Sequence, residues 1–394
     1  MQILANDGLA EQAVKFLHKE GYSVDTEKRS YEDLLKELPH YDALLVRSAT
    51  KVTRELIEAA TTKTGKLKII GRGGVGTDNI DLEAAKERGV VVKFAPYGNM
   101  NATAEHVIGL MFAIARKVPF AHRSLKSGVW HKKPFQGVEL ANQTLGLLGC
   151  GRIGQAVAKK ARDLDMKVVG YDPHPWLESE VDYLDSVEEV LETSDFVSIH
   201  TGGKATLIRA PELEKMKSSA FLINASRGVN VEEDALYNAL KNGQIAGAAL
   251  DCYENEPKNE GEAFTSKLIE LDNIVLSAHL GASTANAARK TSMEIARMVS
   301  KYLKYGDFEQ SVNVGQTVVD EGLDLYTVFI THEDKPGMFG KFGTAFGELG
   351  VNIQENKSRR LDGKAQTVYT IQTKPTPEMR DKLLEIEGVE RVVF

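Results

Sequence analysis

The 394-residue sequence contains only two cysteines, Cys150 and Cys252, and they do not stand in a spacing typical of metal ligands. Disulfide scaffolds and structural zinc sites use several cysteines at short, regular intervals. We therefore expect neither a disulfide framework nor a metal site, and a reducing cytoplasm fits this composition.

Long apolar runs and basic segments are also missing. The first residues, MQILANDG, lack a basic stretch followed by an apolar one, and the longest apolar run, around Val107 to Ala115, is too short to span a bilayer. The formal net charge is −7. Nucleic acids and anionic membranes attract basic surfaces, so we expect neither as a main partner. We predict a soluble, cytoplasmic protein in which an anionic substrate would need a local basic pocket.

The order of apolar segments predicts an α/β protein. Short apolar strands alternate with amphipathic helices, which is typical of βαβ units and parallel sheets. A first series comprises Ile3–Ala5, Ala43–Val46, Leu67–Ile70 and Val90–Phe94. A second comprises Thr144–Leu148, Lys167–Tyr171, Phe196–Ile199, Ala220–Asn224, Gly247–Leu250 and Asn273–Leu276. We predict two doubly wound sheets, with helices from Thr103 to about Lys117 and from Ser283 to about Tyr305 joining them.

The pattern changes after a predicted linker, Asp307 to Gly322. From Leu325 onward the order is strand, helix, strand, strand, helix, strand, which is the ferredoxin-like βαββαβ topology. Its predicted elements are Leu325–Thr331, Met338–Leu349, Asn352–Arg360, Ala365–Thr373, Pro377–Glu387 and Val389–Phe394. A module of this size could regulate the protein or hold a dimer together. A chain of this length is expected to divide into about three domains.

The run TLGLLGCGRIG places three glycines after a buried strand and before a helix. Gly149, Gly151 and Gly154 have the G-x-G-x-x-G spacing, which permits a tight turn, close approach of the backbone to a pyrophosphate, and close packing of helix on strand. The alternative is a plain strand-to-helix connection. Cys150 within the turn could be a stabilised thiolate or simply a tolerated small residue.

Asp172 ends the next strand, near the offset at which a carboxylate accepts hydrogen bonds from the adenosine ribose. A carboxylate there would repel a 2′-phosphate, so we expect NAD in preference to NADP.

Three runs follow late strands of the second series, and each contains a residue suited to hydride-transfer chemistry. These residues are Arg227 in INASRG, Glu256 in LDCYENEP and His279 in SAHLGAST. Oxidation of a hydroxy acid needs a base on the hydroxyl, which suits His279, and a carboxylate on its other ring nitrogen, which suits Glu256. Arg227 can grip a carboxylate with two hydrogen bonds. Taken singly, each could instead be a surface ion pair or a helix cap. Asp251 is placed to orient a nicotinamide amide.

These runs, in this order and spacing, resemble the D-2-hydroxyacid dehydrogenase family, specifically its phosphoglycerate dehydrogenase branch, along essentially the whole chain. The resemblance implies a discontinuous flavodoxin-like substrate domain, residues 1–98 and 283–312, around a Rossmann NAD domain, residues 99–282, followed by a regulatory domain, residues 323–394. It also implies homodimers or homotetramers. Further cofactor contacts that it implies are Arg152, Ile153, His200, Thr201, Ala225, Ser226 and Gly281. The run HTGGKAT departs from the family, because Gly202 and Gly203 stand where proline and leucine are usual.

The resemblance implies oxidation of D-3-phosphoglycerate with NAD, the first step of L-serine biosynthesis. The residues expected to bind this substrate are Arg47, Ser48, Arg72, Gly73, Gly74, Asn101 and Lys132. The arginines could be ordinary surface cations, Asn101 could be a helix cap, and Lys132 stands where the branch often has arginine. Two alternatives remain: a glyoxylate or hydroxypyruvate reductase of the same fold, and a non-catalytic NAD sensor similar to transcriptional corepressors.

The runs THEDKPGMF and GVNI resemble the start of an ACT domain, a βαββαβ fold that binds amino acids. The resemblance implies L-serine as effector at His332, Asp334 and Asn352, although Asp334 stands where asparagine is usual. The alternative is a module that only dimerises.

Overall fold

The structure is a computed structural model that describes residues 1–394 except 177–178, 180, 204, 258–260, 314–325 and 362. The described chain separates into two compact units. The first consists of residues 1–98 and 288–394, and the second of residues 99–287. Within the described residues, we find no helix that is long and apolar enough to cross a membrane.

The first unit contains a five-stranded parallel sheet in the order β2-β1-β3-β4-β5, which is the flavodoxin-like order. Its strands are β1 (Gln2–Ala5), β2 (Ser23–Asp25), β3 (Ala43–Val46), β4 (Ile69–Arg72) and β5 (Val91–Phe94). Helices α1 (Glu11–Lys19) and α11 (Ala285–Tyr305) contribute to the core on one face. Helices α2 (Tyr31–Glu37), α3 (Arg54–Ala60) and α4 (Leu82–Glu87) contribute to the core on the other. Alternate strand residues such as Ile3 and Leu4 enter opposite cores, because successive side chains of a strand point to opposite faces.

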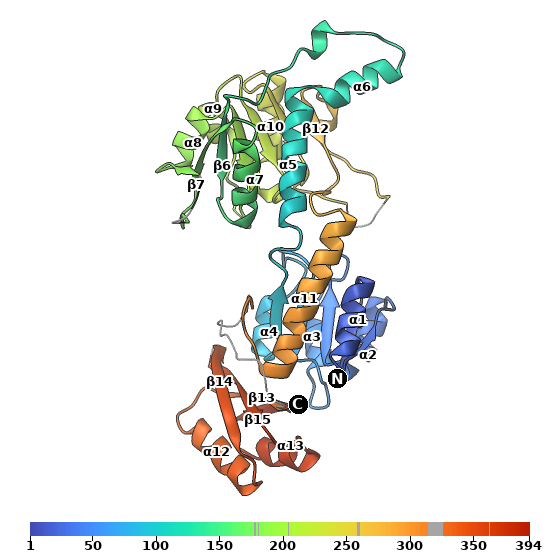
Figure 1. The fold of residues 1–394 in the computed structure, drawn as a ribbon, viewed down its shortest axis with the longest axis vertical. Coiled ribbons are helices and arrows are strands. Elements are labelled where there is room, and N and C mark those ends of the chain that lie inside the picture. The colour runs from blue at the N-terminus through green and yellow to red at the C-terminus, as the bar shows by residue number, and fades with distance from the viewer. Residues whose placement is uncertain (177–178, 180, 204, 258–260, 314–325, 362) are drawn as a thin grey trace. The chain divides into compact units, whose positions relative to one another are not determined.

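The second unit contains a seven-stranded parallel sheet in the order β12-β11-β10-β9-β6-β7-β8, which is the Rossmann order with an additional strand. Its strands are β6 (Thr144–Leu148), β7 (Lys167–Tyr171), β8 (Asp182–Tyr183), β9 (Phe196–Ile199), β10 (Phe221–Asn224), β11 (Gly247–Leu250) and β12 (Ile274–Leu276). Its helices are α5 (Met100–Ala115), α6 (Val118–Lys126), α7 (Arg152–Arg162), α8 (Val187–Thr193), α9 (Ala210–Lys215) and α10 (Glu233–Lys241). Figure 1 shows α5 and α7 side by side on this sheet, and their apolar residues share one core.

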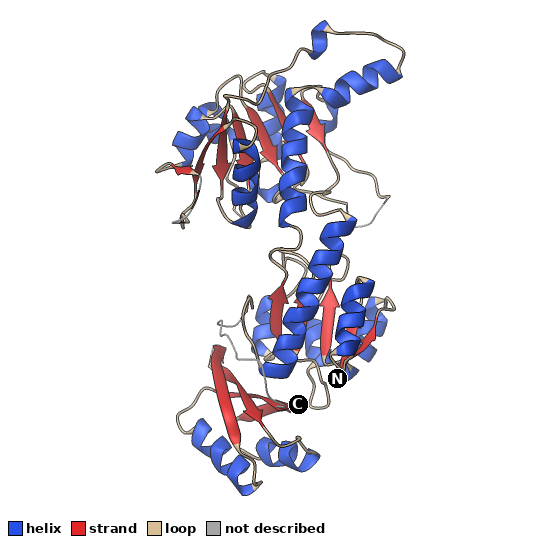
Figure 2. Cartoon of the chain, in the orientation of Figure 1, coloured by secondary structure: helices blue, strands red, loops and turns tan. Residues whose placement is uncertain are grey.

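A four-stranded antiparallel sheet in the order β14-β15-β13-β16 completes the first unit. It is built from β13 (Tyr326–Glu333), α12 (Met338–Glu348), β14 (Ile353–Leu361), β15 (Lys364–Ile371), α13 (Pro377–Leu384) and β16 (Val389–Val393). Figure 2 shows its two helices on one face, whereas helices lie on both faces of each larger sheet. Short 3₁₀ helices are η1 (Leu38–His40), η2 (Lys133–Phe135), η3 (Gly228–Asn230) and η4 (Lys267–Glu270).

The four-stranded sheet shares a core with the first parallel sheet. Phe329 and Val368 pack in one apolar cluster with Tyr302 of α11. The Arg391 guanidinium is buried and donates to the carbonyl oxygens of Gly65 and Leu67, directly before β4. These contacts explain why the two sheets form one compact unit.

The predicted α/β class and the ferredoxin-like C-terminal module are confirmed. Most predicted strands lie within two residues of the observed ones, but the sequence analysis missed β2 and β8. Both are edge strands of two or three residues that include aspartate, so they lack the apolar run that predicts a strand. The predicted linker and the start of the C-terminal module fall partly on residues 314–325, which lie outside the described residues.

Candidate active site

Three loops of the second unit follow neighbouring strands. Strands β10, β11 and β12 pair in parallel, so their last residues, Asn224, Leu250 and Leu276, lie side by side. Arg227, Glu256 and His279 stand in the loops that continue from these ends. The sheet therefore brings together, at its carboxyl edge, three runs that are far apart in the sequence.

Asp251, directly after β11, organises the loop that carries His279. Its buried carboxylate accepts hydrogen bonds from the Ser277 hydroxyl at 2.6 Å and from the N–H groups of Leu280 and Gly281, each at 2.8 Å. Its carbonyl oxygen accepts a bond from the His279 N–H at 2.9 Å. One residue thus fixes the loop at four points.

His106, on α5, adds a further contact to this carboxylate, with its Nε2 at 3.2 Å from an Asp251 oxygen. Burial alone would raise the pKa of Asp251, but hydrogen bonds from His106, Ser277 and the two backbone N–H groups hold that pKa below its usual value. The carboxylate therefore stays charged and acts only as an acceptor.

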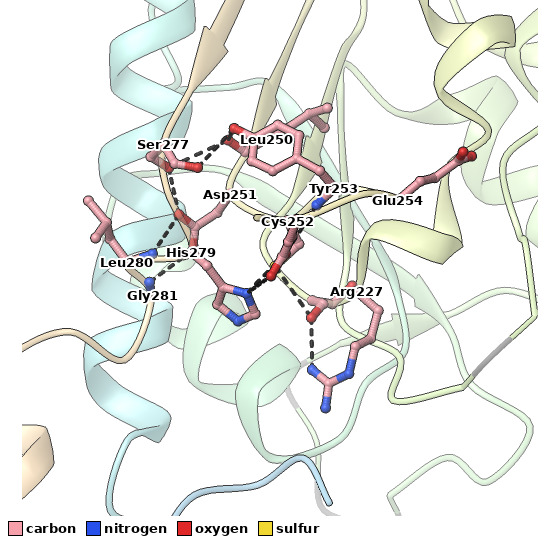
Figure 3. A network of polar contacts seen from close by, with 12 residues as sticks. Arg227, Leu250, Asp251, Cys252, Tyr253, Glu254, Ser277, His279, Leu280 and Gly281 are labelled. Atoms are coloured by element: carbon pink, nitrogen blue, oxygen red, sulfur yellow. Dashed lines mark hydrogen bonds and ion pairs between the residues drawn. The ribbon is translucent and has the colours of Figure 1, made fainter. Parts of the chain in front are cut away.

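His279 has a backbone φ of +52°, in the left-handed region that non-glycine residues seldom occupy. Such a conformation costs about 1 kcal/mol or more and persists where surrounding contacts enforce it. The hydrogen bonds to Asp251 supply those contacts. Figure 3 shows that the His279 ring and the Arg227 guanidinium project to the same side of the strand ends.

The His279 ring pairs with a carboxylate. Its Nδ1 lies 2.9 Å from one oxygen of Glu256 and 3.0 Å from the other. The side chains are 53% and 36% exposed, so the pair faces solvent. Glu256 is itself positioned by the Tyr253 N–H, at 3.2 Å. Hydrogen bonds with the Cys252 thiol and with Glu256 raise the pKa of His279 above its usual value.

Arg227 follows β10 in a loop that is closed by polar contacts. Its Nη1 donates to the carbonyl oxygen of Ser226 at 2.8 Å, and its own carbonyl accepts from the Asn224 side chain at 2.8 Å. The Ser226 hydroxyl donates to the same Asn224 side chain at 2.8 Å, and Ala225 lies between them. These bonds hold the guanidinium at the strand end (Figure 3).

The glycine turn has the geometry that a dinucleotide site needs. Gly149 has a φ of +92°, and a side chain there would meet the His200 backbone. A Cβ on Gly154 would lie 2.5 Å from the Gly149 carbonyl oxygen, whereas one on Gly151 would point into open space. The turn can therefore take a close ligand only beside Gly151.

The polar groups around the turn fit a pyrophosphate. Helix α7 begins with Arg152 and Ile153, and no side chain caps its N-terminus, where N–H groups and the helix dipole favour an anion. The buried Thr201 hydroxyl has no hydrogen-bond partner among the described residues. Asp172 accepts from the Cys150 N–H at 2.7 Å and the His174 N–H at 2.9 Å. Carboxylate oxygens accept more than one hydrogen bond each, so Asp172 can still receive ribose hydroxyls.

The residues expected to bind substrate lie in both units. In the first, the exposed Arg47 and Ser48 follow β3, and Arg72 ends β4 with Gly73 beyond it. Gly74, at φ +149°, leaves room for the Arg72 guanidinium, which a Cβ there would strike. In the second unit two candidates engage neighbours: Asn101 donates to Glu105 at 2.6 Å, and Lys132 lies over the Trp130 ring.

The expected effector residues of the C-terminal module have distinct surroundings. His332 is buried, with Nδ1 2.8 Å from the Glu333 carbonyl oxygen and Nε2 2.8 Å from the Thr367 hydroxyl. Asp334 pairs with Arg360 at 3.0 Å, and Asn352 is exposed. His332 therefore has a structural role within the module.

Sequence reasoning missed several groups of this site. It gave Asp251 a cofactor role only, and it did not place Cys252, Tyr253 or His106 beside the catalytic candidates. Their position in the sequence could have identified two of these residues, because Asp251 and Cys252 directly follow β11 in the run that also contains Glu256.

Known proteins resemble this chain in sequence. The family model described as "D-isomer specific 2-hydroxyacid dehydrogenase, NAD binding domain" matches residues 108–281, and the ACT domain model matches residues 326–388.

Three curated relatives are informative. The chain is 40% identical over 344 residues to the D-3-phosphoglycerate dehydrogenase of Archaeoglobus fulgidus, a match that covers 86% of this chain and 64% of that protein. It is 34% identical over 392 residues to the D-3-phosphoglycerate dehydrogenase of Haemophilus influenzae, with coverages of 98% and 95%. It is 40% identical over 307 residues to the hydroxypyruvate reductase of Thermotoga maritima, with coverages of 77% and 98%. The chain thus spans less than two thirds of the Archaeoglobus relative but nearly all of the other two.

Replacing Gly154 by alanine is expected to weaken NADH binding at least tenfold, because the new Cβ would strike the Gly149 carbonyl oxygen and force the turn open. Overpacking of this kind also costs roughly 1–3 kcal/mol of folding stability. Gly109→Ala on α5 is the control, since its Cβ would meet nothing. NADH fluorescence titration and thermal melting measure both effects, and equal affinity in the two variants would contradict the prediction.

Asp251→Asn should lower kcat/KM for NAD-linked oxidation by roughly 10- to 100-fold, since losing one buried hydrogen-bond acceptor costs about 1–3 kcal/mol. An amide offers one oxygen, so an N–H or hydroxyl of the His279 loop loses its acceptor. Asp272→Asn, at an exposed ion pair with Arg123, is the control. Steady-state kinetics at saturating cofactor checks this, and wild-type kcat/KM in Asp251→Asn would show that the loop does not need the carboxylate.

Proposed function

The chain belongs to the D-isomer specific 2-hydroxyacid dehydrogenase family, and from this premise we propose that it oxidises D-3-phosphoglycerate to 3-phosphohydroxypyruvate with NAD, the first step of L-serine biosynthesis. The observation that carries the chemistry is the 2.9 Å contact between His279 and Glu256 at the carboxyl edge of the second sheet. The substrate is supported by the Haemophilus relative, of which the chain spans 95%.

The protein's own residues divide the work of the reaction. His279 takes the hydroxyl proton on Nε2, because Nδ1 faces Glu256. The Glu256 carboxylate accepts a hydrogen bond from the Nδ1–H group, which fixes the tautomer and stabilises the imidazolium that forms. Arg227 binds the substrate carboxylate and stabilises charge on the C2 oxygen. A nicotinamide cofactor held by the residues around the glycine turn would supply the hydride acceptor for C2.

The choice of NAD rests on Asp172. Its carboxylate stands at the end of β7 with its two oxygens on backbone N–H groups, and the negative charge would repel a 2′-phosphate. The cofactor contacts that we propose are the glycine turn with Arg152 and Ile153, and His200, Thr201, Ala225, Ser226 and Gly281. Burial lowers the pKa of His200 to about 4, so this ring is neutral and adds no positive charge.

The phosphorylated substrate gives the arginines of the first unit a role. We assign Arg47, Ser48 and Arg72, with the backbone of Gly73 and Gly74, to its anionic groups, together with Asn101 and Lys132 of the second unit. Bidentate hydrogen bonds make arginine a strong phosphate and carboxylate ligand, whereas Lys132 supplies a point charge. The second candidate function is a hydroxypyruvate reductase, which the Thermotoga relative favours.

A substrate panel distinguishes the two functions. We expect kcat/KM for D-3-phosphoglycerate to exceed that for D-glycerate by at least 100-fold.

Arg72→Gln should lower kcat/KM for D-3-phosphoglycerate roughly 10- to 100-fold, because a hydrogen bond to a charged group contributes about 1.5–3 kcal/mol. Arg88→Gln, which changes an arginine paired with Glu58, is the control. Equal efficiency on both substrates would favour the reductase.

The pH profile tests the base. Only neutral His279 accepts a proton, so oxidation rises with pH as the ring deprotonates, and its raised pKa places this rise above about pH 6.5, the usual imidazole value. Glu256→Gln removes the negative charge that helps to raise the pKa, so the rise should move to lower pH while kcat falls. The Cys252 thiol also contributes to the raised pKa of His279, so the pH profile of Cys252→Ser measures that contribution separately. A Glu256→Gln profile that overlies the wild type would exclude this pairing.

The ACT domain supports L-serine as an effector in a homodimer or homotetramer. We expect serine to lower activity and to bind in calorimetry. Asp334→Asn, which restores the residue usual at this position, should tighten serine binding, because it removes a carboxylate near the effector's own. D-Serine is the control. Unchanged activity together with no heat of binding would leave the module a purely dimerising one.

A further inference from the structure

Cys252, Glu256 and His279 form a cluster that the proposed reaction uses only in part. One ligand atom from each residue, sulfur, carboxylate oxygen or imidazole nitrogen, lies within 4.8 Å of the others. Cys252 is buried whereas Glu256 and His279 are exposed, and the Cys252 thiol donates to the Ser226 carbonyl oxygen at 3.5 Å. Sulfur, nitrogen and oxygen donors therefore converge at the solvent-facing edge of the active site.

This donor set suits a zinc-type ion. Zn²⁺ binds cysteine, histidine and glutamate in tetrahedral sites, and three protein ligands leave a fourth position for water. A soft sulfur ligand disfavours Mg²⁺ and Ca²⁺, which prefer oxygen. We propose that Cys252, Glu256 and His279 bind a Zn²⁺ ion that inhibits the enzyme.

The His279–Glu256 pair needs only a small movement to accept the ion. Zinc–ligand bonds of about 2.0–2.3 Å at tetrahedral angles place neighbouring ligand atoms roughly 3.5 Å apart. His279 Nδ1 and the nearer Glu256 oxygen are now 2.9 Å apart, so they must separate slightly. The Glu256 side chain is 36% exposed and can rotate toward solvent to do so.

The inhibition follows from the proton positions. In the proposed reaction His279 carries a proton on Nδ1 and has a free electron pair on Nε2. An ion on Nδ1 needs the electron pair of that nitrogen, so the single proton of the neutral ring moves from Nδ1 to Nε2 by exchange with solvent. The ring then has no electron pair for the substrate hydroxyl. Binding also releases the Cys252 thiol proton, because the thiolate is the ligand.

The spacing of the cysteines could not predict this metal site, because only one of its three ligands is a cysteine and the ligands come from two loops. Cys252 and Glu256 follow β11, whereas His279 follows β12, so the cluster exists only because these strands are neighbours. The claim about binding is independent of the substrate, and only the claim of inhibition rests on the proposed function.

The test uses the purified full chain with Zn²⁺, and with Co²⁺ as a spectroscopic probe. We expect one Zn²⁺ per subunit in calorimetry, and a thiolate-to-cobalt charge-transfer band in the near ultraviolet. Cys252→Ser should lose the band and bind Zn²⁺ roughly 100-fold more weakly. Cys150→Ser is the matched control: this second buried cysteine should be dispensable for the band and for Zn²⁺ affinity.

Activity provides the second readout. Zn²⁺ should inhibit wild type and Cys150→Ser, EDTA should reverse the inhibition, and Cys252→Ser, measured against its own metal-free rate, should resist it. The inference is overturned if Co²⁺ gives no thiolate band, or if Cys252→Ser binds Zn²⁺ as tightly as wild type. A chain that shows the band but turns over no D-3-phosphoglycerate would refute the proposed function and leave the metal site standing.

Discussion

The candidate active site depends on the buried carboxylate of Asp251. It accepts hydrogen bonds from a hydroxyl and two backbone N–H groups of the loop after β12, and the carbonyl of the same residue receives the His279 N–H. A loop that must hold a histidine at φ +52° would otherwise relax, because that conformation is unfavourable for a side chain with a Cβ. The charge at the strand end therefore determines where the imidazole lies.

The neighbours of His279 support the proposed proton transfer and also form the proposed site for an inhibitory metal ion. In the proposed reaction Glu256 supplies the negative charge that an imidazolium needs during proton transfer, and the Tyr253 backbone N–H holds Glu256 in place. The Cys252 thiol completes a set of donors that also suits a soft divalent ion. Groups that stabilise a proton on Nδ1 stabilise a metal there as well, since both are cations.

The C-terminal module makes buried polar contacts with the segment that precedes β4. Its Arg391 donates to carbonyl oxygens directly before β4, and Lys68 in that segment contacts Asp42 and the Phe394 carbonyl. Burial lowers the pKa of Lys68, and this ion pair with Asp42 opposes that shift. The strand that follows ends at Arg72, one of the residues assigned to the substrate. The module and this strand therefore share buried polar contacts as well as an apolar core.

The sequence by itself determined the two parallel sheets, the ferredoxin-like module and the glycine turn, and it singled out Arg227, Glu256 and His279 as catalytic candidates. These features depend on local patterns: apolar periodicity, glycine spacing and position after a strand. It could not determine which strands are neighbours. Only the tertiary structure decided that β11 lies beside β12, and therefore that Asp251 clamps the His279 loop and that His279 lies beside Cys252 and Glu256. Such contacts join residues more than twenty positions apart, and no local pattern encodes the hydrogen bonds that backbone N–H groups make to a distant carboxylate.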